Sequence, residues 1–193
     1  MEAFVRIVQD GKYKSCWKIV HDRNWDKLYE SKPQLNLEIV REFYVNALPL
    51  DGGRFEFKNW VQADDELCEF HDILARKAWD FESVKNKLCL PGFSYELSAG
   101  GIPQKFIRGS LKTKAQLLMT VVLYNIRPHS HTSSIPMEVG GLLDCILEGK
   151  TVDVARLISN ELKKVALSGT SLGDRTPCQL TYPGLIMGLC RRE

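Results

Sequence analysis

Long apolar runs are missing from this chain. Its longest uninterrupted apolar stretches cover only a few residues, such as 117–119 and 121–123, whereas a helix that spans a bilayer needs about 20. The N-terminus has no basic stretch followed by an apolar one, the pattern of a secretory signal. We therefore expect no membrane partner and an intracellular location, in the cytoplasm or the nucleus.

Cysteine pairs with the spacing of a metal site are also absent. No two of the cysteines are separated by two residues, which is the spacing that makes a zinc site recognisable. The chain has 193 residues, of which 44% are hydrophobic, so it can bury a core without disulfides. We expect reduced thiols, no structural metal and no cofactor. The six cysteines are Cys16, Cys68, Cys89, Cys145, Cys178 and Cys190.

Phosphate-binding and acid–base motifs are absent as well. The glycine pairs at 52–53 and 100–101 lack the preceding strand and the following Lys-Ser/Thr of a phosphate-binding loop, so they are typical of turns. The three acids at 64–66 are adjacent, and adjacent residues point around a helix rather than at one spot. We predict no catalytic residues from these motifs.

The histidines occur without the partners that a metal or catalytic site requires. His129 and His131 form a His-x-His pair, but no carboxylate or cysteine lies nearby in sequence to complete a ligand set. His21 and His71 each stand alone on a helical segment, where packing or surface placement is usual. A thiol hydrolase could combine a histidine and a cysteine that are remote in sequence. Buried structural thiols are the simpler interpretation.

Helical periodicity is what the sequence has in abundance. Apolar residues recur at steps of three and four in several windows, most of them bracketed by residues that start or stop helices. Asn36, Ser110 and Thr151 are the predicted N-caps, and a further helix is predicted to start at Asp80. The predicted helices cover 14–30, a segment after Asn36, segments beginning at Asp64 and Asp80, a long segment from Ser110 to Pro128, a segment from Ser134 to Gly149, a segment after Thr151, and 183–190.

Two segments depart from this pattern. Residues 54–61 alternate apolar and polar side chains, as a short β-strand or hairpin does. Residues 91–110 contain six glycines and prolines, too many for one long regular element, which makes this segment a candidate hinge. We expect a mostly α fold, with residues 1–193 forming a single compact multi-helix domain and a short hairpin near 54–61.

Several blocks of sequence occur in an order that carries a family resemblance. They begin with VREFYVNA at 40–47 and continue with 88–92, 108–111, 127–131, 149–154 and 183–192. These blocks resemble the plant transposon protein domain family, which occurs in plant LTR-retrotransposon-like reading frames. The resemblance extends from about Trp17 to the C-terminus, with a divergent segment at 55–62. It implies a retrotransposon origin and brings no catalytic residue or cofactor.

Charge is distributed unevenly along the chain. No acidic residue lies between Glu96 and Glu138, whereas residues 62–82 carry seven. A basic face on 97–137 could neutralise phosphates, with Phe106 or Tyr124 stacking on bases. Alternatively, the basic and acidic segments face one another within the fold or a dimer. The basic residues of the acid-free stretch are Lys105, Arg108, Lys112, Lys114 and Arg127.

These patterns favour a non-enzymatic interaction module of retrotransposon origin, which binds protein partners or associates with itself. A nucleic-acid-binding domain that uses residues 97–137 is the first alternative. An enzyme of unrecognised geometry is the second.

Overall fold

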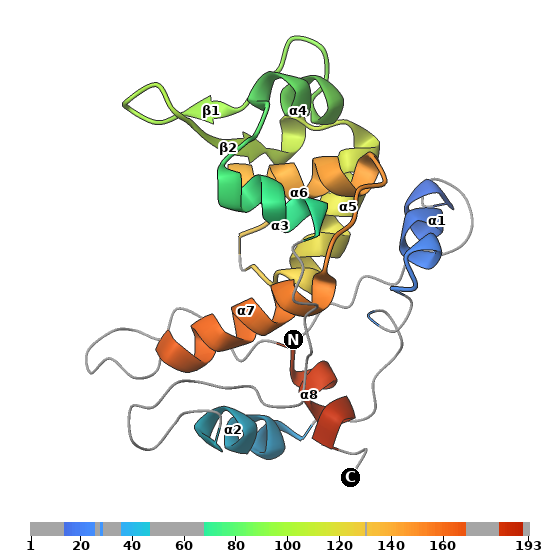
Figure 1. The fold of residues 1–193 in the computed structure, drawn as a ribbon, viewed down its shortest axis with the longest axis vertical. Coiled ribbons are helices and arrows are strands. Elements are labelled where there is room, and N and C mark those ends of the chain that lie inside the picture. Colours follow the sequence, from blue (N-terminus) through green and yellow to red (C-terminus); the bar gives the residue numbers. More distant parts are fainter. Residues whose placement is uncertain are drawn as a thin grey trace. The chain divides into compact units, whose positions relative to one another are not determined.

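The computed structural model describes residues 14–25, 28, 36–46, 68–129, 131–168 and 182–190. Within them the chain forms eight α-helices and a three-stranded antiparallel sheet (Figure 1). The prediction of a mostly α fold with a small β element is therefore confirmed. The strand or hairpin predicted at 54–61 lies outside the described residues, and the hairpin that the structure does show covers residues 96–107.

The helices differ in length and in how much of their surface is apolar. They are α1 (Lys14–Asp22), α2 (Leu37–Asn46), α3 (Glu69–Arg76), α4 (Phe81–Leu88), α5 (Thr113–Val121), α6 (Met137–Leu147), α7 (Val154–Ser168) and α8 (Pro183–Cys190). The other elements are β1 (Glu96–Leu97), β2 (Pro103–Ile107), the 3-10 turn η3 (Arg108–Ser110), the π-helical turn η4 (Val122–Ile126) and β3 (Ser134–Pro136). No helix in the described part of the chain is long and apolar enough to cross a membrane.

The chain divides into two compact units. The first comprises 1–29, 64–125 and 129–153, and the second comprises 30–63, 126–128 and 154–193. The segment 91–110 lies inside the first unit, where it carries β1, β2 and η3, so no boundary between the units falls on it. That the whole chain works as a single domain stays a prediction.

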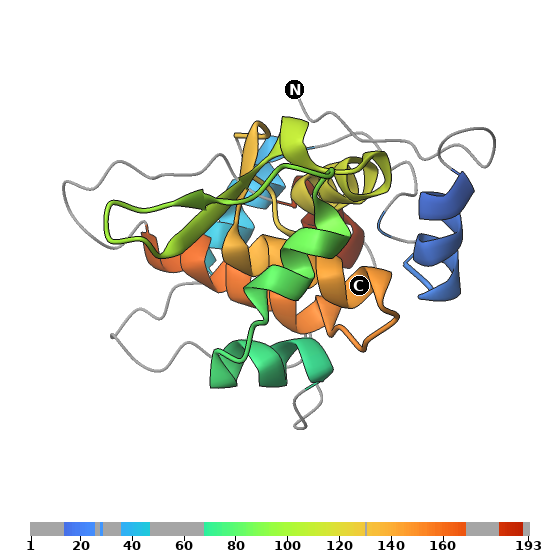
Figure 2. The ribbon, with the colours of Figure 1, turned by 90° about the horizontal axis from the view of Figure 1, so that it is seen from above.

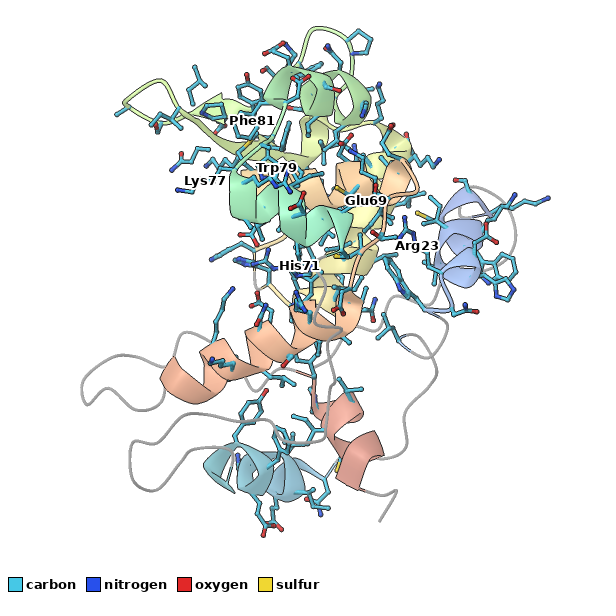
Figure 3. The ribbon with its side chains drawn as sticks, in the orientation of Figure 1. Arg23, Glu69, His71, Lys77, Trp79 and Phe81 are labelled. Atoms are coloured by element: carbon cyan, nitrogen blue, oxygen red, sulfur yellow. The ribbon has the colours of Figure 1, made fainter. Side chains whose placement is uncertain are left out.

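Helix α6 forms the centre of the first unit. It contacts α3, α4, α5, β2 and β3, and every residue from Val139 to Ile146 is buried. Two glycines let aromatic rings pack directly on its backbone. A Cβ atom on Gly140 would lie 2.5 Å from the ring of Phe106, and one on Gly141 would lie 2.5 Å from the ring of Trp79. Glycine is therefore needed on this face of α6, where Trp79 approaches from the segment before α4 (Figure 3).

The sheet lies against α6 through its central strand. Strand β2 pairs antiparallel with β1 on one side and with β3 on the other. Phe106 and its partner Ile135 are fully buried, whereas the rest of β2 is only partly covered. In Figures 1 and 2 the hairpin formed by β1 and β2 extends beyond the helices α3, α4 and α6 of its own unit.

One predicted N-cap, Asn36, and one predicted helix start, Asp80, are confirmed. The side-chain oxygen of Asn36 accepts a hydrogen bond from the Glu38 N–H at 2.9 Å, at the start of α2. Asp80 accepts one from the Ser83 N–H at 3.1 Å, at the start of α4. Each bond satisfies a backbone donor that the first turn of a helix leaves open.

The other two predicted caps are wrong. Ser110 belongs to η3, and α5 begins only at Thr113, because Leu111 is first drawn into an antiparallel bridge with Cys89. Thr151 lies ahead of α7, which begins at Val154, and its hydroxyl accepts a hydrogen bond from the Glu69 N–H of α3 instead. In both places the residue accepts a hydrogen bond from a segment remote in sequence, Ser110 from Leu90 and Thr151 from Glu69, and does not cap the helix that follows it. The predicted helix start at Asp64 lies outside the described residues.

The second unit brings α2 and α8 into contact. Its best-defined polar contact is the hydroxyl of Tyr182, which donates to the Ile126 carbonyl at 2.6 Å. Burial raises the pKa of this Tyr182 hydroxyl, so it remains a hydrogen-bond donor at neutral pH. Along α7, the residues predicted to face inward are buried or half-buried, which confirms the periodicity found in the sequence. They are Val154, Leu157, Ile158, Leu162 and Val165.

Candidate interaction surface and the predicted site residues

Exposed large apolar side chains are concentrated on one short segment of the first unit. The described residues include six such side chains, and four of them lie between positions 90 and 102. These four residues lie on two successive turns of the chain and are together called the hairpin patch: Leu90 (38% exposed), Phe93 (53%), Leu97 (56%) and Ile102 (67%). Single exposed apolar residues are normal on a protein surface, whereas a concentration of them is typical of a contact surface.

The first half of the patch is held by a tight turn after α4. The Phe93 N–H donates to the Leu90 carbonyl at 3.1 Å, and Gly92 between them has a φ of 82°, which glycine adopts readily. The Leu90 N–H donates in turn to the Ser110 carbonyl at 2.8 Å. These bonds fix the backbone and leave both apolar side chains facing water.

The second half of the patch flanks the turn of the hairpin. The Ser98 N–H donates to the Ile102 carbonyl at 2.8 Å, and the Gly101 N–H donates to the Ser98 carbonyl at 2.9 Å. Gly101 has a φ of 74°, again a conformation that favours glycine. Leu97 and Ile102 are therefore presented on an ordered turn.

Aromatic rings hold the base of the hairpin to the body of the unit. The ring of Tyr95 lies edge-on to that of Phe106 at 5.9 Å and to that of Phe81 at 6.5 Å, between ring centroids. Its hydroxyl donates to Glu82 at 2.9 Å, and this hydrogen bond raises the pKa of Tyr95. The hairpin that carries Leu97 and Ile102 thus begins at a base with fixed packing.

The predicted basic site residues Lys105 and Arg108 both make contacts within the first unit. Lys105 Nζ lies 3.1 Å from a carboxylate oxygen of Glu96, across the β1–β2 pair. The half-buried Arg108 donates through Nη2 to the Thr120 hydroxyl at 2.8 Å, and through Nη1 to the Thr132 carbonyl at 3.5 Å. Arg108 therefore joins η3 to α5 and to the segment before β3.

The remaining predicted site residues are divided between the units. Lys112 Nζ donates to the Asn86 carbonyl at 2.7 Å, and Lys114 is exposed on α5. Arg127 belongs to the second unit, where it lies 3.0 Å from Glu161. The structure thus places four of the five predicted basic residues in one unit and the fifth in the other.

The aromatic side chains proposed to stack on bases have different surroundings. Phe106 is fully buried against Gly140, so the prediction that it stacks on a base is wrong. Tyr124 is 39% exposed. The apolar seam that helical periodicity predicts for the segment from Ser110 to Pro128 is confirmed, since all six of its members are fully buried. They are Leu111, Ala115, Leu118, Met119, Val122 and Ile126.

The described thiols differ sharply in their surroundings. Cys16, Cys89 and Cys145 are buried, and loss of water raises the pKa of Cys16 and Cys145 to about 11. Cys68 is only partly buried, and its Sγ lies 2.9 Å from Nδ1 of His71. No group of three or more His, Cys, Asp or Glu side chains that could hold a metal occurs in the ranges the structure describes.

The hairpin patch and the Cys68–His71 pair were both missed from the sequence. The glycines and prolines of 91–110 indicated a hinge, and nothing in the order of the apolar residues there shows that they are exposed. In the sequence, His71 stands alone on its helical segment. The available signal was the spacing of three between Cys68 and His71, because residues three apart at a helix start share one face.

Mostly helical units with one small antiparallel sheet define only a broad class of fold. The sequence places the chain more closely: it belongs to the family described as "Putative plant retrotransposon-related domain", whose model matches residues 21–193. The resemblance seen in the sequence blocks is thereby confirmed. No curated protein and no solved structure matches the chain.

Proposed function

We propose that this chain is a non-enzymatic interaction module of retrotransposon origin, which binds other protein chains through the hairpin patch. The observation that carries the proposal is that four of the six exposed large apolar side chains in the described residues fall within 90–102. Apolar surface left in water is unfavourable by about 25 cal/mol per Å², and contact with a partner recovers this free energy. Large apolar side chains that ordered turns leave in water are candidates for a contact surface.

Two features of the patch support a protein rather than a nucleic acid as partner. Lys105 of β2, in the same hairpin as Leu97 and Ile102, is paired with Glu96, so its positive charge is partly compensated and attracts phosphates less. The backbone of both turns is hydrogen-bonded before any partner arrives, so binding costs little further ordering. An ordered apolar projection suits an apolar recess on another protein chain.

A second copy of the chain is the partner that can be tested first. We would replace Leu97 and Ile102 with serine, since both side chains are more than half exposed and contribute little to the core. Leu37→Ser is the matched control, because Leu37 is 51% exposed and belongs to the second unit. Light scattering after gel filtration, over a range of concentrations, reports the mass of each protein.

We expect the wild-type chain and Leu37→Ser to associate alike, and the double variant to associate at least about tenfold more weakly. Burying a single leucine-sized side chain contributes roughly 1.5–3 kcal/mol, which corresponds to tenfold or more in affinity. If the wild-type chain is a monomer, the same three proteins serve as baits in plant extract. Loss of a captured protein in the double variant alone supports the patch as the binding surface. Equal masses and equal captured proteins for all three would contradict the proposal.

A further inference from the structure

Cys68 occupies a defined polar environment at the start of α3. Its Sγ lies 2.9 Å from Nδ1 of His71 and accepts a hydrogen bond from the Asp153 N–H at 3.2 Å. The imidazole is held in place by burial, since His71 is only 7% exposed and its ring lies edge-on to that of Phe70. A partly buried thiol thus has a base on one side and a backbone donor on another.

A reciprocal set of hydrogen bonds fixes this environment. The Thr151 hydroxyl and carbonyl accept from the Glu69 and Phe70 N–H groups, at 3.0 and 3.2 Å. In return, the Glu69 carboxylate accepts from the Thr151 N–H at 2.6 Å and from its hydroxyl at 3.1 Å. The first turn of α3 and the segment 151–153 are therefore clamped together, which keeps the Asp153 N–H aimed at the sulfur.

The clamp lies among charges of both signs. The guanidinium of Arg23 donates to the carbonyls of Ile146 and Lys150, at 3.2 and 2.9 Å, and so holds the chain that leads from α6 to Thr151. Hydrogen bonds from Thr151, and after them the positive charges of Lys150 and Arg23, lower the pKa of the Glu69 carboxyl. Figure 3 shows Glu69 and His71 on α3.

We propose that Cys68 is a nucleophilic thiol activated by His71, and a site of oxidation by oxidants of the peroxide class. The thiol proton passes to Nδ1 of His71 across the 2.9 Å contact, which leaves a thiolate. The Asp153 N–H and the positive end of the α3 dipole both favour negative charge on the sulfur.

The reaction with hydrogen peroxide balances with these groups alone. The thiolate attacks one peroxide oxygen, so that an S–O bond forms and the O–O bond breaks. The hydroxide that leaves takes the proton from the His71 imidazolium and becomes water. Sulfur is oxidised to the sulfenic acid and the peroxide is reduced, with no other reactant required.

The other thiols described in the structure serve as internal controls. Cys16, Cys89 and Cys145 are buried, and burial raises the pKa of each of them. A group that stays protonated and covered reacts slowly with both peroxide and alkylating reagents. Alkylation of these three thiols in any variant reports that the fold has opened.

The first test compares the intact chain in buffer and in urea. Dimedone traps sulfenic acid after brief treatment with hydrogen peroxide, iodoacetamide measures thiol reactivity, and mass spectrometry assigns each product to a cysteine. We expect Cys68 to react roughly tenfold faster in the folded chain than in urea, despite being partly covered, because only the fold supplies His71. A slower or equal rate in the folded chain overturns the proposal.

The second test replaces the base. His71→Asn keeps a hydrogen-bonding atom near the sulfur and removes the proton acceptor, so we expect at least a roughly tenfold slower reaction of Cys68. Cys145 must remain unreactive in this variant, as evidence that the fold is intact. An unchanged Cys68 rate in folded His71→Asn overturns the proposal. If the variant unfolds, the proposal is judged from the reaction rates of Cys68 in the wild-type chain, in buffer and in urea.

Discussion

Single glycines determine how closely the first unit can pack. On α6, Gly141 lies where a Cβ atom would be 2.5 Å from the indole of Trp79, and Gly140 has the same relation to the ring of Phe106. Rings at such positions cannot give way without leaving their own packing. Each glycine is therefore required by a neighbour rather than by its own backbone conformation.

Replacing Gly141 with alanine should consequently destabilise the fold. We expect a loss of about 1–3 kcal/mol in the free energy of unfolding, the usual result of overfilling a packed core. Gly109→Ala is the matched control, because nothing lies within 4 Å of a Cβ atom at that position. Urea unfolding of the two variants should separate them clearly. Equal midpoints would mean that Trp79 does not pack on α6 as described.

A second residue with a measurable role is Glu69. Hydrogen bonds from the backbone N–H and the hydroxyl of Thr151 hold the pKa of its carboxyl below the ordinary value of 4.5. A carboxyl with a lowered pKa in the folded state stabilises the fold above its unfolded pKa, and this contribution is lost as the pH falls through the folded value.

Glu69→Gln should therefore be less stable than the wild-type chain at pH 7, and the difference should shrink below about pH 4.5. Urea midpoints measured at several pH values test both the sign and the window. A difference that stays constant down to pH 2, or that grows there, would show that the carboxylate is not held by Thr151 in solution.

Among the elements, the helices were largely predictable because helical periodicity comes from local sequence. The predicted bounds of 183–190 coincide with α8, and the buried seam of α5 is the predicted one. Helix starts were less predictable where the capping partner is remote. Thr151 caps α3 across 82 positions of sequence, and no local pattern indicates that.

The sheet could not be predicted for a different physical reason. Strand β2 buries Phe106 fully and no other of its residues, so the alternation of apolar and polar residues that reveals a strand is nearly absent. Two of the glycines of 91–110 that favour a hinge, Gly92 and Gly101, instead adopt the positive φ of the two turns that hold the hairpin patch. Exposure of the patch follows from tertiary packing, which the order of residues does not reveal.

The contacts of Arg108 in η3 and of Lys105 in β2 determine how much charge reversal at each position should destabilise the fold. Exposed basic residues at 105 and 108 would tolerate substitution, but Arg108 is half-buried and donates to Thr120 and Thr132. We expect Arg108→Glu to lower the free energy of unfolding by about 1–3 kcal/mol, because the Thr120 hydroxyl and the Thr132 carbonyl would lose their donor and face a carboxylate. Lys105→Glu should lose at most about 1 kcal/mol, since its pair with Glu96 is exposed. Thermal unfolding that affects the two variants equally would contradict these contacts.

At the scale of the whole molecule, family membership gives an origin and the hairpin patch gives a proposed mode of action. If the chain instead binds nucleic acid, its affinity should fall steeply as the salt concentration rises. Titration with RNA and single-stranded DNA at two salt concentrations separates the two. We expect weak binding that Lys114→Glu, on the exposed face of α5, leaves unchanged. Tight, salt-sensitive binding that this variant weakens would favour the alternative.

Site-specific photo-crosslinking tests the central claim most directly. A photoreactive amino acid placed at position 97, within the hairpin patch, reports which protein surfaces approach it when the chain is irradiated. The matched probe stands at position 37, which is similarly exposed but lies in the second unit. We expect position 97 to give crosslinks to a second copy of the chain or to a partner protein in plant extract, and position 37 to give few. Crosslinks from position 97 only to water and to its own chain, as from position 37, would contradict the proposed function.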